Sequence, residues 1–156
     1  MQVVARWVLA GCLALPAVQA CAEDLYGRVV AVLDGDTIKI LDATNRQITI
    51  RLSEIDAPEK GQAFGQASRR ALSDLVARKR VVASCPSTDR YGRHVCSVTA
   101  DGLNVNSRQV QTGMAWVYRR YAKPDSPLLR IEKEARAGGY GLWRDPEPIP
   151  PWEWRQ

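Results

Sequence analysis

The sequence predicts an α+β protein, a five-stranded β-barrel of the OB type with three helices. Two observations favour this class. Five short apolar or alternating runs are separated by turn dipeptides. One helical pattern interrupts the runs after the third, and helical patterns return only towards the C-terminal end. A β-sandwich would need more strands and no helix in the middle of the chain.

Each strand has its own signal. Asp34-Gly35 between two apolar runs is typical of a hairpin. The run RQITIRLSEI alternates after a turn at Thr44-Asn45, with its isoleucines and leucine on one side. The runs RVVASC and HVCSVTA flank the loop PSTDRYGR. Two strands are therefore expected within residues 25–41, on either side of the Asp34-Gly35 turn, and three more at residues 46–55, 80–85 and 94–100.

Three helices follow from apolar residues at three- and four-residue spacing. The first covers residues 62–80, and its apolar side is Phe64, Ala67, Ala71, Leu72, Leu75 and Val76. A second, short helix follows the Asp101-Gly102 turn. The third is entered at Pro127 and stopped by Gly138-Gly139. The tail after it is rich in proline and tryptophan, and we expect Trp143 to pack on the core.

Residues 1–22 are predicted to be a secretory signal peptide, and residues 23–156 the folded domain with its Pro/Trp-rich tail. Arg6 precedes the uncharged apolar run WVLAGCLALPAV, and small-residue cleavage patterns follow. The run is shorter than the about 20 residues of a membrane span. Cleavage after Ala20 would leave Cys21 as a site for a lipid anchor, the less favoured alternative; cleavage after Ala22 would remove it. We expect an exported protein, periplasmic or extracellular.

The chain is basic, with 22 Lys and Arg against 17 Asp and Glu and a net charge of +5. The predicted signal peptide holds one of the arginines and no acidic residue, so the basic character belongs to the domain. A basic domain favours a polyanionic partner such as nucleic acid or an anionic membrane surface, although many basic proteins bind neither. At 156 residues the chain suits one domain with one core, and we expect a monomer.

Two cysteines of the predicted domain are placed to form a disulfide. Cys85 ends the fourth strand run and Cys96 lies in the fifth. Export to an oxidising compartment favours a bond between them. The closed loop of about 12 residues is worth roughly 3 kcal/mol in the chain-entropy account. The absence of a CxxC motif argues against a zinc site or a thioredoxin-type site.

A single histidine, His94, limits the chemistry. A Ser-His-Asp triad or a pair of histidine metal ligands would need more supporting residues than the chain offers. The motifs GxSxG and HExxH and a glycine-rich phosphate loop are also absent. Acid–base and metal chemistry must therefore come from carboxylates, with arginines to bind anions.

Three charged stretches qualify, although each alone is typical of solvated charge in a loop. Pro58 forces the chain out of the third strand, which presents Asp56 and Glu59 on a rigid bend. Carboxylates from Asp36 and Asp56 suit a hard cation such as Ca²⁺ or Mg²⁺. Arginines would bind a phosphate in bidentate fashion, and a further carboxylate would act on a water. Together these parts predict a metal-assisted phosphodiester hydrolase. The stretches are DGDT (34–37), RLSEIDAPE (51–59) and DRYGR (89–93).

These motifs, in this order and with a helix between the second and third, resemble the staphylococcal (micrococcal) nuclease family. The resemblance covers roughly residues 25–143. It implies an OB-type barrel with three helices and Ca²⁺-dependent cleavage of DNA and RNA with little sequence preference. The products would carry 5′-hydroxyl and 3′-phosphate ends.

The resemblance also implies a role for each site residue. Asp36 and Asp56 would bind the metal together with the backbone carbonyl of Ala57. Glu59 would act on the attacking water, as general base or as orienter. Phosphate binding and charge stabilisation in the transition state are expected from Arg51 and Arg93. Tyr121 stands where the family has an aromatic that packs near the terminal nucleotide, and Tyr91 and Arg119 are further candidates for substrate contact.

The chain departs from the family pattern in a few places. Ala57 stands where the best-known members have threonine, which removes a hydroxyl but keeps the carbonyl. The loop after Glu59 is short, which leaves substrate preference open. Arg119 stands where an aromatic contact is expected. Glu54 has no role in the pattern, and we interpret it as solvated charge.

Two rival functions belong to other classes. One is a non-catalytic nucleic-acid-binding module on the same barrel. The other is an envelope-associated protein that uses its basic face. A binding module of this kind usually lacks one or more of the charged site residues, which are all present here, and an envelope protein would leave the set without a purpose. We therefore predict a calcium-dependent endonuclease. That set is Asp36, Arg51, Asp56, Glu59 and Arg93.

Overall fold

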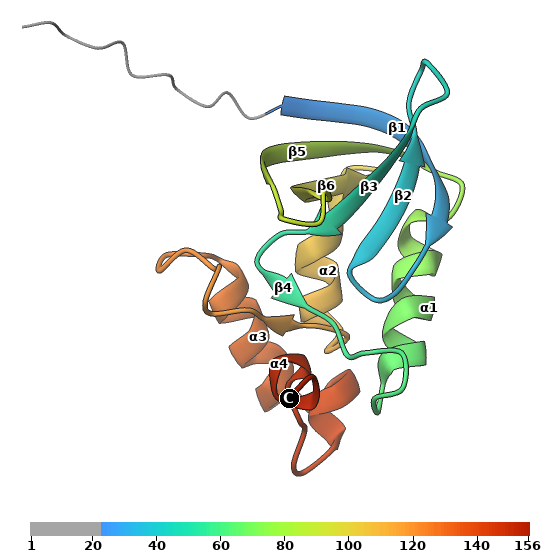
Figure 1. Ribbon diagram of the computed structural model, residues 1–156. Coiled ribbons are helices and arrows are strands. Elements are labelled where there is room, and N and C mark those ends of the chain that lie inside the picture. The colour runs from blue at the N-terminus through green and yellow to red at the C-terminus, as the bar shows by residue number, and fades with distance from the viewer. Residues whose placement is uncertain (1–22) are drawn as a thin grey trace, which may run out of the picture.

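A computed structural model describes residues 23–156, so the predicted signal peptide lies outside the described residues. Five strands run in the order β3-β2-β1-β5-β6, and β3 pairs in parallel with β6 to close the ring. The other neighbours in the ring are antiparallel. This confirms the predicted five-stranded barrel (Figure 1). The strands are β1 (Glu23–Val32), β2 (Thr37–Leu41), β3 (Gln47–Leu52), β5 (Arg80–Thr88) and β6 (His94–Ala100).

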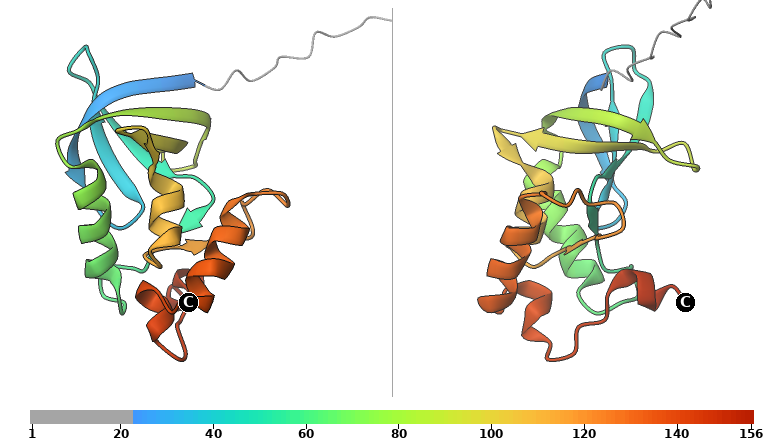
Figure 2. Two further views of the ribbon diagram at one scale, coloured as in Figure 1. Left: turned by 180° about the vertical axis from the view of Figure 1, so that it is seen from behind. Right: turned by 90° about the vertical axis from the view of Figure 1, so that its left-hand side faces the viewer.

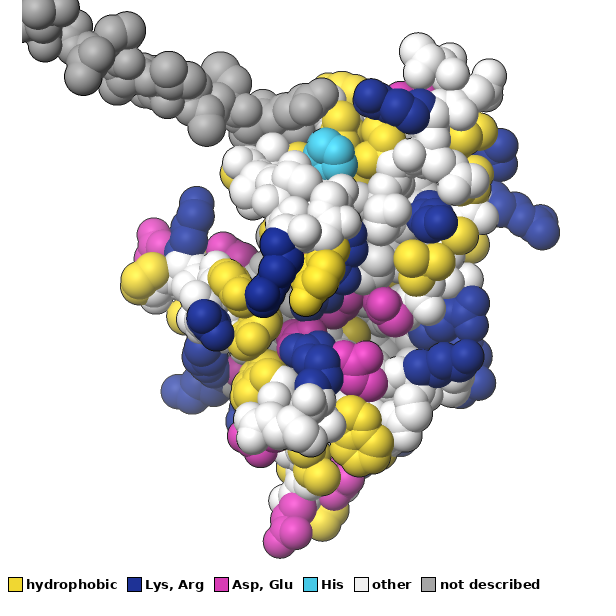
Figure 3. All heavy atoms as spheres, viewed as in Figure 1, with side chains coloured by type: hydrophobic (Ala, Val, Ile, Leu, Met, Phe, Trp, Pro, Cys, Tyr) yellow, Lys and Arg dark blue, Asp and Glu magenta, His cyan; other side chains and the backbone are white. Residues whose placement is uncertain are grey.

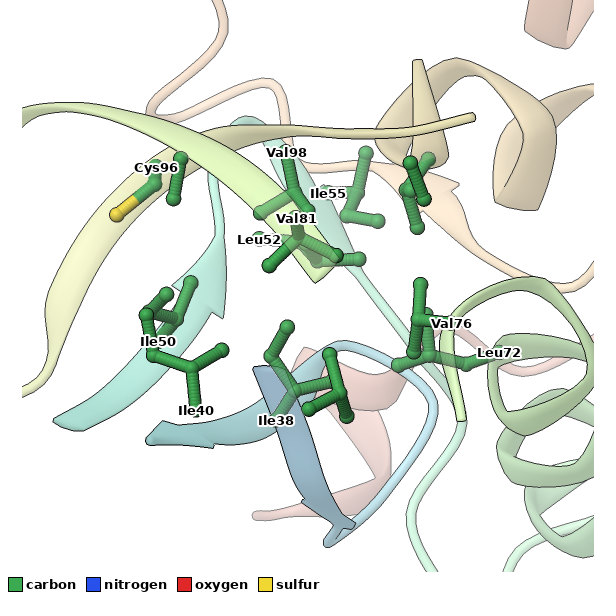
Figure 4. Packing of buried hydrophobic residues seen from close by; sticks show 14 of the residues in the cluster. Ile38, Ile40, Ile50, Leu52, Ile55, Leu72, Val76, Val81, Cys96 and Val98 are labelled. Carbon is green, nitrogen blue, oxygen red and sulfur yellow. The ribbon is translucent and has the colours of Figure 1, made fainter. Parts of the chain in front are cut away.

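The core fills the barrel because alternate residues of each strand point inward. In β3 the exposure alternates along the strand, so that Ile48, Ile50 and Leu52 are buried. Ile38 and Ile40 of β2 are fully buried beside them. Figure 4 shows these side chains converging with those of β5 and β6. The predicted inward side of the third strand is therefore confirmed.

Two strand boundaries differ from the prediction. The third strand ends at Leu52, since Glu54 adopts a left-handed backbone with φ 62° and the chain turns. The two-residue strand β4 (Ile55–Asp56) then pairs with β8 (Trp116–Val117). The fourth strand runs on to Thr88, three residues beyond Cys85, because an irregularity between Ser84 and Ser87 accommodates Pro86.

The three predicted helices correspond to α1 (Gly65–Val76), α2 (Val105–Gln111) and α3 (Leu128–Ala137). They lie together at one end of the barrel (Figures 1 and 2). The short strand β7 (Leu103–Asn104) leads into α2. The tail adds the 3₁₀ helix η1 (Gly141–Arg144) and the one-turn helix α4 (Pro151–Trp154). Within residues 23–156, every helix is too short or too polar to span a bilayer.

The tail packs on the domain, as predicted for Trp143. Its ring meets that of Trp116 edge to face, with centroids 4.4 Å apart. Leu142 beside it is buried. Figures 1 and 2 show the C-terminal end close to the segment between β4 and α1. The last residues are therefore placed beside the strand exit that carries Asp56.

Cys85 and Cys96 form a disulfide between β5 and β6, as predicted. Both residues are buried. The bond joins two adjacent strands of the barrel wall, so it reinforces a pairing that the antiparallel ladder already makes.

Candidate active site

Two buried aspartates meet one arginine where β2, β3 and β4 come together. Arg51 lies opposite Thr37 in the β2–β3 ladder, so its side chain stands next to Asp36. Its two terminal nitrogens divide between the acids: Nη1 pairs with Asp36, and Nη2 lies 2.8 Å from Oδ1 of Asp56. Asp36 is 3% exposed and Asp56 is 1% exposed. The structure thus brings together three of the predicted site residues.

Burial and charge act against each other in this cluster. Burial raises the pKa of Asp56, even though hydrogen bonds and charge from two arginines oppose the shift. Burial alone would lower the pKa of Arg51, but the carboxylates of Asp36 and Asp56 raise it above its ordinary value. The guanidinium therefore stays charged. Two carboxylates held together in this way form a site with excess negative charge, which favours a cation.

A third acidic group, Asp34, precedes the pair. Its carboxylate accepts a hydrogen bond from the Asp36 backbone N–H at 3.0 Å. Burial, followed by repulsion from the neighbouring Asp36 carboxylate, raises the pKa of Asp34 to about 6. The local field at this turn is therefore strongly negative at neutral pH.

The turn that carries Asp36 is fixed from behind by two helices. A Cβ on Gly35 would lie 1.9 Å from the Ser68 hydroxyl of α1, so only glycine fits this close approach. The fully buried Gln109 of α2 donates from Nε2 to the Gly35 carbonyl at 2.7 Å. Asp36 itself accepts a hydrogen bond at Oδ2 from the Ala57 N–H, 2.8 Å away. These contacts fix the position of Asp36 at the edge of the barrel.

Glu59 lies beyond the Pro58 bend, on the loop between β4 and α1. Its side chain is 40% exposed and pairs with Arg155 from the C-terminal tail, with Oε1 and Nη1 2.6 Å apart. The other terminal nitrogen of Arg155, Nη2, lies 2.5 Å from Oδ2 of Asp56. Arg155 thus joins the carboxylates of Asp56 and Glu59.

The predicted metal set fits a hard cation by its chemistry. Asp36 and Asp56 are near enough to share one guanidinium, and both offer carboxylate oxygens. The carbonyl of Ala57, between Asp56 and the Pro58 bend, would be the third donor. Among the described residues, no three His, Cys, Asp or Glu side chains converge as a ready-made metal cluster. Ca²⁺ would therefore need water or substrate oxygens to complete its shell.

A wide groove of about 1060 Å³ opens beside Arg51. Figure 3 shows arginine and carboxylate side chains gathered in the middle of this face, between the barrel and the C-terminal end. The groove suits an extended, negatively charged chain. Its charged and aromatic lining is Arg51, Glu54, Asp89, Arg90, Tyr91, Arg93, Tyr118, Tyr121, Lys123 and Arg155.

The turn at residues 89–93 forms one wall of the groove. Asp89 accepts from the Nε of Arg93 at 2.8 Å and from the backbone N–H of Arg93 at 3.0 Å. Tyr91 is 72% exposed, with the guanidinium groups of Arg90 and Arg93 near its ring. Arg93 and Tyr91 therefore face the groove, as their predicted roles require, although neither contacts the carboxylate cluster.

The aromatic residues after β8 form the opposite wall. Tyr121 lines the groove, is 62% exposed and meets Tyr118 edge to face, with ring centroids 5.0 Å apart. Arg119 has another partner: it donates to the buried carboxylate of Glu132 at 2.6 Å. The substrate contact of Arg119 stays a prediction. Arg119 could bind substrate only if this ion pair opened or if its remaining guanidinium N–H groups faced the groove.

Some site residues were missed from the sequence. Arg155, Gln109 and Ser68 carry no local pattern that marks them, since their partners lie far away in the chain. Glu54 is not simply solvated: its carboxylate accepts from the Ser126 hydroxyl at 2.5 Å, just before α3. The residues around Glu54 would not have revealed this partner, because Ser126 is 72 positions away.

Comparisons with known proteins agree with this geometry. A family model described as "Staphylococcal nuclease homologue" matches residues 49–145, more than half of the chain. The chain belongs to the staphylococcal nuclease family. A protein of Shigella flexneri named "Micrococcal nuclease" is 46% identical over 97% of this chain and 91% of its own length. An "Uncharacterized endonuclease" of Escherichia coli O157:H7 is 48% identical over 86% of this chain and 87% of its own length.

A third relative, "Protein ParB" of Escherichia coli, is 43% identical over 85% of this chain and 80% of its own length. These matches span most of the length of each related protein, so the similarity extends over whole domains and not only over a short motif. Membership of the staphylococcal nuclease family makes the chain a nuclease, a hydrolase acting on phosphodiester bonds. The resemblance inferred from the three motifs is confirmed.

Proposed function

We propose that this chain is an exported, calcium-dependent endonuclease that cleaves DNA and RNA with little sequence preference and leaves 3′-phosphate ends. One observation carries the proposal. Two buried carboxylates, Asp36 and Asp56, share the guanidinium of Arg51, which lines a groove of about 1060 Å³. Glu59 lies beside them, linked through Arg155.

The roles follow from position. Bound at Asp36, Asp56 and the Ala57 carbonyl, Ca²⁺ would polarise the scissile phosphate and hold a water near it. Glu59 would accept a proton from that water while the water oxygen forms its bond to phosphorus. Arg51 and Arg93 would offset the negative charge that develops on the phosphate oxygens. The bond from phosphorus to the 5′ oxygen breaks, and that oxygen takes a proton to become the 5′-hydroxyl.

The groove supports a substrate read by its backbone. Its charged walls would bind phosphates, while exposed rings such as Tyr91 and Tyr121 offer faces for base stacking. Both kinds of contact tolerate any sequence.

Digestion of plasmid DNA and of a structured RNA, with Ca²⁺ or with a chelator, tests this function. Cleavage of both only with Ca²⁺ is the expected result. Fragment ends should resist polymerase extension until a phosphatase removes the 3′-phosphate. Retarded migration without cleavage at any Ca²⁺ concentration would instead support the non-catalytic binding module.

Export is a separate part of the proposal, and it depends on residues 1–22. Mass spectrometry of the chain recovered from the periplasm or medium should give a mature N-terminus after Ala20 or Ala22. A mass increase on Cys21 would indicate the lipid anchor. Recovery of the full-length chain from the cytoplasm alone would contradict export.

A further inference from the structure

Turn hydrogen bonds hold the backbone of the loop that carries Glu59, with the Gln62 N–H donating to the Glu59 carbonyl at 2.9 Å, but among the described residues the Glu59 carboxylate has no ion-pair partner within the loop itself. Residues 57–64 lie between β4 and α1 and belong to neither a helix nor a strand. Glu59 itself has a side chain that is 40% exposed. A glutamate on such a loop samples several rotamers, and the neighbouring acids repel its carboxylate away from the cluster. A productive position therefore requires an outside partner.

The C-terminal tail is docked firmly enough to be that partner. Trp152 stacks on Tyr118, with ring centroids 5.1 Å apart and planes 3° apart, and meets Trp116 edge to face. Pro151, which opens α4, is buried. The one-turn helix α4 thus sits on the aromatic residues of and after β8, with Arg155 following directly.

Two contacts join this tail to the Glu59 loop. Arg155 donates from Nη1 to Glu59 and more weakly, at 3.3 Å, to Oδ1 of Asp56, while its Nη2 donates to Oδ2 of Asp56, so one guanidinium holds both carboxylates. The buried Gln62 makes the second contact. Its Nε2 donates to the Ile149 carbonyl at 2.6 Å, and its Oε1 accepts from the Glu59 N–H at 3.0 Å. Both the backbone and the carboxylate of Glu59 are therefore tied to the tail.

We propose that Arg155 is a positioning residue for Glu59, and that the segment Ile149–Arg155 braces the loop of residues 57–64. This rests on the proposed role of Glu59 in handling the attacking water. Arg155 offsets the repulsion between Glu59 and Asp56 and holds the Glu59 carboxylate on the side of the metal ligands. Misplacement by about 1 Å can cost about 10²-fold in rate, so the brace contributes to turnover more than to substrate binding.

The opposite role, a tail that blocks the site, predicts an opposite result. Arg155 occupies both oxygens of Asp56, with Nη1 3.3 Å from Oδ1 and Nη2 2.5 Å from Oδ2. If this contact were mainly an obstacle to the cation, removing it would raise activity. If Arg155 positions Glu59, removing its side chain lowers activity. The direction of the change in activity therefore separates the positioning role from the blocking role.

Steady-state kinetics of Arg155→Gln on a short fluorogenic oligonucleotide, with saturating Ca²⁺, test the proposal. The expected result is a kcat lower by about 10- to 100-fold with KM changed by less than about 3-fold. Arg155→Lys keeps one charged donor and should recover part of the loss. Arg144→Gln is the matched control, since it removes the same charge from an exposed position in the tail and should behave as wild type.

A double-mutant cycle with Glu59→Gln tests whether Arg155 acts through Glu59. The double variant should be no slower than Glu59→Gln alone. Hydrogen exchange gives a readout besides activity: amides of residues 59–65 should exchange about tenfold faster in Arg155→Gln, with the barrel amides unchanged. Thermal unfolding establishes that each variant is folded.

The possible results distinguish failure of the positioning role from failure of the proposed function. An unchanged or raised kcat in Arg155→Gln, or an equal further loss in the Glu59→Gln background, would overturn the positioning role while leaving the proposed function intact. Full activity of Glu59→Gln would overturn the proposed function itself. The proposal is supported if Arg155→Gln slows turnover only when Glu59 is present and also speeds amide exchange in residues 59–65.

Discussion

Arg51 and Asp56 are five positions apart, yet the Nη2 of Arg51 lies 2.8 Å from the Asp56 carboxylate because the chain turns at Glu54 between them. The same guanidinium pairs with Asp36. Asp56 is almost fully buried, and the side chain of Arg51 is only 16% exposed. The site is therefore held together by an ion pair that water screens weakly.

Arg51→Gln should destabilise the metal-free protein, because it leaves two buried carboxylates without this cation. The expected loss in the free energy of unfolding is about 3 kcal/mol. Urea unfolding in chelator measures it. Saturating Ca²⁺ should recover part of the loss, since the ion would neutralise the same carboxylates. Unchanged stability in chelator would contradict the structural role given to this ion pair.

Glu59→Gln should remove most of the activity and spare the fold. A glutamine cannot accept the proton from water, so kcat should fall by about 10²- to 10⁴-fold. The side chain is half exposed and outside the barrel core, so the unfolding temperature should stay close to that of wild type. Glu134→Gln is the control and should keep full activity, since Glu134 is an exposed residue of α3 that pairs with Arg130 on the same helix.

Asp34→Asn should stabilise the metal-free protein at neutral pH. The pKa of Asp34 is raised to about 6 from 3.8, so the folded state holds its proton to a higher pH than the unfolded chain does. Stability therefore falls as pH rises through this window, and the ionised group costs about 1–3 kcal/mol above it. Asparagine keeps the acceptor for the Asp36 N–H. Unfolding at pH 7 and pH 4 in chelator should show a gain at pH 7 that disappears at pH 4.

Asp42→Asn is the matched control for this pH dependence. The backbone hydrogen bond from Arg46, followed by the Thr44 hydroxyl, lowers the pKa of Asp42. Such a group stabilises the folded state above its unfolded pKa, so removing its charge should give no gain at pH 7. Equal gains in both variants would indicate a general charge effect and would contradict the specific role of Asp34.

Replacing both Cys85 and Cys96 with alanine should lower the free energy of unfolding by about 3 kcal/mol through the loss of the closed loop. The bond lies in the β5–β6 wall, away from the carboxylate cluster. The folded fraction should therefore cleave nucleic acid at the wild-type rate. Denaturant titration and kinetics on the same sample separate stability from activity.

Local pattern was enough for most of the fold. The alternation of Ile48, Ile50 and Leu52, and the turns at Asp34-Gly35 and Asn45, appear in the structure because side-chain period and turn chemistry act over a few residues. The strand ends at Leu52 and Thr88 were placed less well. They depend on a left-handed residue and on a bulge at proline, and tertiary pairing selects both.

The sequence by itself determined the barrel and the disulfide pair, because side-chain period and turn residues act locally, and its motifs supplied Asp36, Arg51 and Asp56, which the structure brings together. Tertiary structure alone decided which distant groups support them: Gln109 behind the Gly35 turn, and Arg155 on Asp56, 99 positions away. No local period records such partners. Burial and packing choose them, as the stacking of Trp152 on Tyr118 fixes where Arg155 lies.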